Sequence, residues 1–217
     1  MQEWFLQNQK RIASIGGMAA LAAAVVIGGY AFVTNRQNRA SSAFALALAA
    51  YHAPVVANAP TNNSSLLFYK TDSEKFQDAA KKFYDVASRY SWSSPGRFAR
   101  YYAALCQRDV GNAAEAEKEL KSLVGGRDAE LASLAKMALA GIYVQAGRND
   151  EAEKLFREIE DHPTNLVPKA TAALARAELY SKTKPTEAKA LYQQIQKDNP
   201  AMAAGDEASK QIENQAR

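Results

Sequence analysis

The sequence predicts an all-α protein in which a single transmembrane helix precedes a solenoid of stacked helix pairs. The first observation behind this prediction is a signature that recurs at a fixed interval of 36 residues. The second is one long uncharged segment near the N-terminus. The third is that no segment alternates apolar and polar residues over any length, as a half-buried strand would. A period of this size is typical of helical units that bury their apolar faces against their neighbours.

The recurring signature is an alanine followed, four residues later, by a large apolar residue and, after three more, by another apolar residue. Its alanines are Ala80, Ala116, Ala152 and Ala188. Its large residues are Tyr84, Leu120, Phe156 and Tyr192. A small residue lets two helices approach closely, and a large one fills the volume behind the crossing. Each copy therefore predicts the second helix of a helix pair.

Residues 12–34 are predicted to form a transmembrane helix, after a short tail at residues 1–11. The 22 residues from Ile12 to Val33 carry no charge. At about 1.5 Å per residue they can cross the roughly 30 Å hydrocarbon core of a bilayer. A cleaved signal peptide and a buried core helix are the alternatives. The length of the run and the basic residues after it favour an anchor.

Residues 35–70 are predicted to hold one helix, at 37–51, followed by a long connection rich in Pro, Asn and Ser. Residues 71–217 are predicted to form the repeat domain. Thr71 and Glu74 have the spacing of a capping box, so a helix should run from there to about residue 90. Gly and Pro then separate further helices, the last of which presents a polar face and caps the stack. These are expected at 97–110, 113–124, 128–146, 150–160, 168–182, 185–197 and 201–214.

The composition argues against several classes of function. The 27 basic and 23 acidic residues give a net charge of +4, too even for a nucleic-acid footprint, which needs a concentrated basic face. The single cysteine, Cys106, lies among apolar residues and is predicted to be buried rather than reactive. His52 and His162 belong to no metal-binding or catalytic motif. We therefore assign no catalytic, cofactor-binding or metal-binding residue and do not expect an enzyme.

Charged pairs on the second helices have a simple interpretation. Glu117 and Lys121 are four residues apart, a spacing at which side chains meet on a helix surface, and Arg157 lies near Glu151 in the sequence. We interpret them as solvated helix faces, each pair contributing a few tenths of a kcal/mol.

The units resemble tetratricopeptide repeats, most clearly at residues 137–163. That copy has the family's small residues, Ala140 and Ala152, where its two helices cross, and a turn glycine, Gly147. In the following copy, one extra turn residue places Ala175 at the crossing. The resemblance implies that the first helix of each pair lines a concave groove that binds other proteins. Helix phases place six residues in this groove, with packing between units as their alternative role: Tyr101, Arg108, Met137, Gln145, Arg176 and Tyr180.

The layout of the whole chain resembles the ancillary subunit of the bacterial SecYEG translocon and its relatives. The similarity consists of a short tail, an anchor, an Ala-rich helix containing Arg39–Phe44, and then degenerate repeats. It implies a single-pass protein of the bacterial inner membrane with a cytoplasmic N-terminus and a periplasmic repeat domain. Its expected partners are the translocation channel, periplasmic chaperones or unfolded clients. A structural scaffold, or a fixed subunit of a larger envelope complex without a client role, is the alternative.

Overall fold

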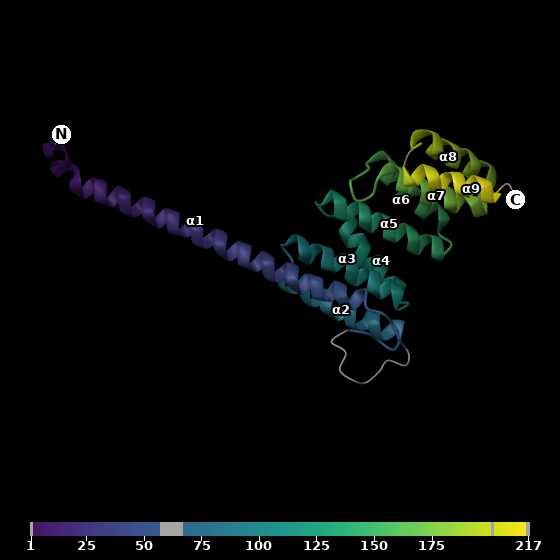
Figure 1. Cartoon of the computed structure of the whole chain (residues 1–217), viewed down its shortest axis with the longest axis horizontal. Coiled ribbons are helices and arrows are strands. Elements are labelled where there is room, and N and C mark those ends of the chain that lie inside the picture. The colour runs from purple at the N-terminus through teal and green to yellow at the C-terminus, as the bar shows by residue number, and fades with distance from the viewer. Residues whose placement is uncertain (1, 57–66, 201, 216–217) are drawn as a thin grey trace.

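The computed structural model describes residues 2–56, 67–200 and 202–215, and for residues 2–17 and 19–21 only the backbone. In these ranges the chain is helical: α1 (Gln2–Tyr51), α2 (Asp72–Arg89), α3 (Ser94–Asp109), α4 (Ala113–Val124), α5 (Ala129–Gln145), α6 (Asn149–Asp161), α7 (Lys169–Thr183), α8 (Pro185–Asp198) and α9 (Ala203–Gln215). The β structure of the described ranges is one isolated bridge, between Val55 and Tyr69. Figure 1 shows α2 to α9 stacked in sequence order, while the N-terminal part of α1 extends away from them. The predicted all-α repeat fold is confirmed.

The prediction of a transmembrane helix at residues 12–34 is wrong for the described chain. Among the residues that the structure describes, no helix is both long enough and apolar enough to cross a membrane. Much of the predicted span, residues 12–17 and 19–21, lies outside the residues whose side chains are described.

The helix boundaries follow from local capping. The hydroxyl of Thr71 accepts a hydrogen bond from the backbone N–H of Glu74, 3.1 Å away, as the capping box predicts. Asp128 caps α5 in the same way, through the N–H of Leu131. Gly111 and Gly147 have φ angles of +91° and +73°, values that favour glycine. Each ends the first helix of a pair, so the two turns are repeat-equivalent.

The alanines of the recurring signature lie at the helix crossings. Ala116, Ala152 and Ala188 are completely buried, and Ala80 is 6% exposed. The prediction for the crossing in α7 is wrong by two residues: Ala177 is completely buried there, whereas Ala175 is half-buried. Ala177 lies 37 residues after Ala140, its equivalent at the crossing in α5, so this interval is one residue longer than the 36-residue repeat.

The C-terminal end of α1 is the first helix of the first pair. Its residues Ala47 and Ala50 are completely buried in a core shared with α2 and α3. An aromatic cluster joins the three helices, with ring centroids 5.2–6.3 Å apart, in the range of favourable aromatic contacts. Its members are Phe44, Tyr51, Phe76, Phe83 and Tyr102. The helix predicted at residues 37–51 is the C-terminal part of α1.

The stack is curved, with the first helices on its inner side. Helix α1 packs on α3, α3 on α5, and α7 on α9. The second helices α4, α6 and α8 instead make their main contacts with the first helices that flank them in sequence. Because α1, α3 and α5 contact one another in turn and α7 contacts α9, while the second helices pack mainly on first helices, we infer that the free faces of the first helices form the concave side of the solenoid.

Candidate functional site

A stripe of half-buried apolar and small residues follows the concave side of the solenoid. We call it the inner stripe. On α5 its members are three or four positions apart and so share one face of that helix, Met137 follows Tyr101 by one 36-residue repeat, and all of its residues belong to the first helices of successive pairs. They are Tyr101 of α3, Leu134, Met137 and Gly141 of α5, and Leu174 and Ala175 of α7. The stripe presents apolar surface that is packed on one side and open to solvent on the other.

The inner stripe ends in a cavity between α7 and α9. The cavity has a volume of about 530 Å³, which is within the range of pockets that bind ligands. Leu174 and Ala175 form its wall on α7, Ala204 lies opposite on α9, and Glu178 and Glu207 add negative charge. The cavity can therefore hold an apolar side chain of a partner beside a basic or polar group.

Four of the six residues predicted from the sequence lie on or beside the inner stripe. Tyr101 and Met137 belong to it, and both also pack against the core, so the structure gives them a packing contact as well as an open face. Gln145 is exposed at the end of α5. Arg108 forms an ion pair of 2.7 Å with Asp109 and keeps 30% of its side chain exposed.

The other two predicted residues lie on the opposite side of α7, against α6. Arg176 donates two hydrogen bonds to Glu160, of 2.7 and 2.8 Å, and the two side chains are only 12% and 11% exposed. Tyr180 is 3% exposed. The structure brings the pair together, with the guanidinium carbon 5.7 Å from the Tyr180 ring centroid. Both side chains are thus engaged within the fold rather than on the inner stripe.

A buried glutamate ties α4 to the next helix pair. The carboxylate of Glu117 accepts hydrogen bonds from Tyr143, at 3.3 Å, and from Arg148, at 2.8 Å, and forms an ion pair with Lys121 at 2.6 Å. Its side chain is 20% exposed. We call this arrangement a glutamate bracket. Because its partners come from α4, from α5 and from the turn between α5 and α6, it fixes the angle between neighbouring units.

The same bracket recurs one repeat later. Glu153 accepts from Tyr180 at 2.6 Å and pairs with Arg157 and Lys184 at 2.9 and 3.5 Å. Its side chain is also 20% exposed. The interpretation of Glu117 as part of a solvated helix face is therefore wrong, whereas Glu151, whose side chain is 53% exposed, does lie on such a face. Arg157 pairs with Glu153, whereas Glu151 pairs with Arg148.

The brackets predict that stability falls in acid. Hydrogen bonding from Lys121 lowers the pKa of Glu117 and outweighs burial. Burial raises the pKa of Glu153, but hydrogen bonds from Tyr180 and Arg157 outweigh it, so the net pKa is also lowered. Folded pKa values below the unfolded ones mean that the stabilisation is complete above the unfolded pKa, about 4.3, and is lost as pH falls through the folded values.

The test is thermal unfolding followed from pH 7 to pH 3. We expect Glu117→Gln and Glu153→Gln each to lower the free energy of unfolding by about 1–2 kcal/mol at pH 7, and the double variant to have a shallower loss of Tm in acid than the native chain. Glu115→Gln, which changes an exposed glutamate on the same helix as Glu117, is the matched control. A native acid profile in the double variant contradicts this assignment.

Cys106 is buried, as predicted from its apolar neighbours. Its side chain is completely inaccessible. Burial raises the pKa of its thiol to about 12, with a smaller contribution from the charge of Asp109. The thiol is therefore protonated at neutral pH, and it fills space in the core around α3.

Leu134, Gly141 and Leu174 are surface residues that sequence reasoning missed. All three are half-buried. Leu134 and Gly141 lie three and four residues from Met137 on α5, and that helical spacing is the signal that could have identified them. Leu174 lies 37 residues after Met137.

One known protein family matches most of the chain. A family model described as a tetratricopeptide repeat-like domain matches residues 2–194. The matched range includes every residue of the inner stripe and both glutamate brackets. No curated protein matches the chain, and no solved structure does.

Proposed function

Because the chain belongs to the tetratricopeptide repeat-like domain family, whose repeats generally bind other proteins, we propose that it holds a segment of a partner protein along the inner stripe. The main observation behind this proposal is that one side of the inner stripe is open to solvent. Half-buried apolar residues on α3, α5 and α7 follow one face, and a cavity of about 530 Å³ lies at its end. Aromatic and aliphatic residues in such positions are frequent anchors of protein interfaces.

Gly141 offers a way to test this surface without disturbing the core. It lies in the middle of the inner stripe, and a Cβ added there meets nothing within 4 Å. We expect Gly141→Leu to keep its Tm and to weaken partner binding roughly tenfold, which corresponds to about 1.4 kcal/mol. The leucine side chain occupies the space that the partner segment needs.

The measurement is quantitative mass spectrometry of proteins retained from an extract of the source cells by the immobilised full chain. Lys154→Leu is the matched control, because Lys154 is exposed on the second helix α6 and the substitution adds the same apolar side chain to the outer face. A photocrosslinker at Met137 then identifies the captured segment. Equal retention by native chain and Gly141→Leu, or equal loss in both variants, contradicts binding at the inner stripe.

A narrower proposal concerns the partners. The resemblance of the chain's layout to the ancillary SecYEG subunit supports a role in protein translocation or chaperone networks, with the repeat domain in the periplasm and no enzymatic activity. Crosslinking from Tyr101 in cells tests it: recovery of the translocation channel or periplasmic chaperones supports the proposal. A single stoichiometric partner that survives purification favours a structural scaffold, and recovery of cytoplasmic proteins alone contradicts the compartment.

A further inference from the structure

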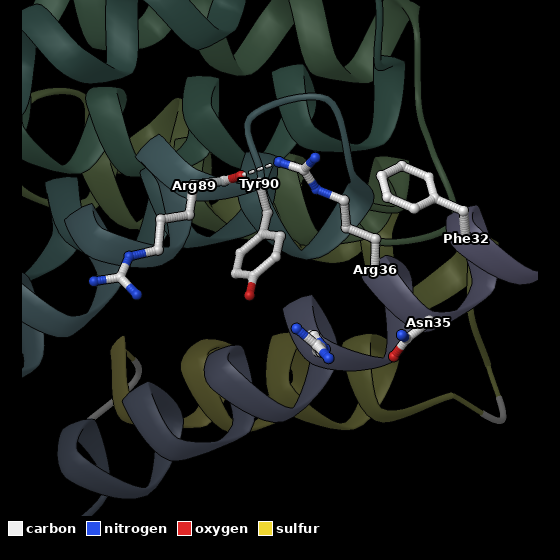
Figure 2. A pocket seen from close by; sticks show the side chains of 6 residues that line it. Phe32, Asn35, Arg36, Arg89 and Tyr90 are labelled. Atoms are coloured by element: carbon white, nitrogen blue, oxygen red, sulfur yellow. Dashed lines mark hydrogen bonds between the residues drawn. The ribbon is translucent and has the colours of Figure 1, made fainter.

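A second surface, separate from the inner stripe, lies where α1 meets the C-terminal end of α2. It is a pocket with a volume of about 560 Å³. Figure 2 shows the side chains that line it, with the Arg36 guanidinium beside the backbone carbonyl of Arg89 and the Phe32 ring next to it. The lining residues are Phe32, Asn35, Arg36, Arg39, Arg89 and Tyr90. We call it the arginine pocket.

Among the described side chains, two of its three guanidinium groups have no acidic partner. Arg89 forms an ion pair of 2.7 Å with Asp85. Across the part of the chain whose side chains are described, no carboxylate oxygen lies within 4.0 Å of a nitrogen of Arg36 or Arg39, although six of the other described arginines besides Arg89 do form such pairs. Both side chains are exposed. The pocket therefore presents positive charge that the fold itself does not neutralise.

Arg36 is held in place from several sides. One of its nitrogens donates to the carbonyl oxygen of Arg89 at 3.3 Å. Its guanidinium carbon lies 6.0 Å from the Phe32 ring centroid and 5.9 Å from that of Trp92, distances at which a cation and an aromatic ring attract each other. A guanidinium has five N–H donors, so most of those of Arg36 remain available to a ligand in a fixed orientation.

The arrangement of the two free arginines selects the kind of anion. Arg36 and Arg39 are three residues apart on α1, so their side chains leave one face of the helix about 5–6 Å apart. This spacing suits two separate carboxylates better than one compact ion. A guanidinium also matches a carboxylate with two parallel hydrogen bonds. The pocket volume fits several side chains, and its aromatic rim suits their methylene groups.

We propose that the arginine pocket binds an acidic segment of a partner protein, with neighbouring carboxylates paired to Arg36 and Arg39. This rests on the proposed protein-binding function and adds a contact outside the inner stripe. A partner that engages both surfaces gains affinity from the second contact, because its acidic segment is then held close to the pocket.

The test is the binding of a fluorescent oligoglutamate peptide to the full chain, measured by fluorescence anisotropy. We expect Arg36→Gln/Arg39→Gln to weaken binding roughly tenfold, the effect of losing about two ion pairs, and added salt to weaken binding by the native chain. Arg127→Gln/Lys189→Gln is the matched control, because it removes two exposed basic residues without touching the pocket. Arg39→Gln alone leaves the Arg36 contact with Arg89 intact and should give a smaller loss.

The proposal is overturned if both double variants lose the same amount of peptide affinity, or if an oligoglutamine peptide binds as tightly as oligoglutamate. It is also overturned if equimolar inorganic phosphate displaces the peptide, which would indicate a site for small anions. The result is independent of the inner stripe. If oligoglutamate does not bind while Gly141→Leu still reduces partner retention, only the acidic-segment proposal fails. If Gly141→Leu has no effect, the proposed function fails whatever the peptide does.

Discussion

Arg176→Leu is expected to lower the free energy of unfolding by about 3 kcal/mol, which for a chain of this size corresponds to a fall in Tm of about 8 °C. Arg176 and Glu160 form a bidentate ion pair between α7 and α6, and both side chains are nearly buried. Removing the guanidinium leaves the Glu160 carboxylate without its partner in a place that water hardly reaches. The free-energy cost of leaving a buried charge unpaired is much larger than the net free energy that the ion pair contributes.

The double variant Glu160→Leu/Arg176→Leu separates these effects. Replacing both partners with apolar residues of similar size removes the unpaired charge, so we expect its free energy of unfolding to return to within about 1 kcal/mol of the native value. Chemical denaturation of the native chain, of Arg176→Leu, of Glu160→Leu and of the double variant measures the difference. If the double variant is as unstable as the sum of its single variants, the pair does not act as a buried unit. If the double variant still retains partner proteins, the Glu160–Arg176 pair contributes to stability and does not take part directly in binding.

Gly96→Ala is the second substitution with a large expected effect, a loss of about 3 kcal/mol or more. Gly96 is buried in the first turn of α3, where its N–H donates to the Ser93 hydroxyl. A Cβ at this position would overlap the carbonyl oxygen of Tyr90 and lie 2.5 Å from its carbon. Both atoms belong to the backbone, so the turn from α2 to α3 has to open before an alanine fits.

Gly141→Ala is the matched control, and its effect should have the opposite sign. A Cβ at Gly141 meets nothing within 4 Å, and the residue lies inside α5. Alanine favours the helix over glycine by about 1 kcal/mol, so we expect Gly141→Ala to raise Tm slightly. Thermal unfolding of both variants is sufficient. Equal stability of Gly96→Ala and Gly141→Ala contradicts the close approach at Tyr90.

Local signals predicted the helices well, because caps and turns depend on neighbouring residues. Thr71 accepts the hydrogen bond that its spacing from Glu74 predicts, and Pro185 stands in the first turn of α8. The periodic alanines were predictable for a related reason: each repeat applies the same packing rule. The register of α7 was not, since the completely buried residue at its crossing is Ala177, two positions after the predicted Ala175.

The side-chain network could not be predicted from helix phase alone. Glu117 and Tyr143 are 26 residues apart and come together only when neighbouring pairs stack. For the same reason, the phase of α7 did not reveal that Arg176 turns toward Glu160. The inner stripe is intermediate: Tyr101 and Met137 were found from sequence, whereas Gly141 has no side chain that would mark it as a surface for binding.

Helix α1 has a mechanical consequence. It continues without a break from the projecting part near residue 22 to its packed end at Tyr51, about 45 Å along the axis. Its last turns are locked into the aromatic cluster with α2 and α3. A force applied to the far end of α1 therefore acts as a torque on the first helix pair. The repeat domain rotates together with α1, because within the described helix no flexible segment separates the far end from the packed end.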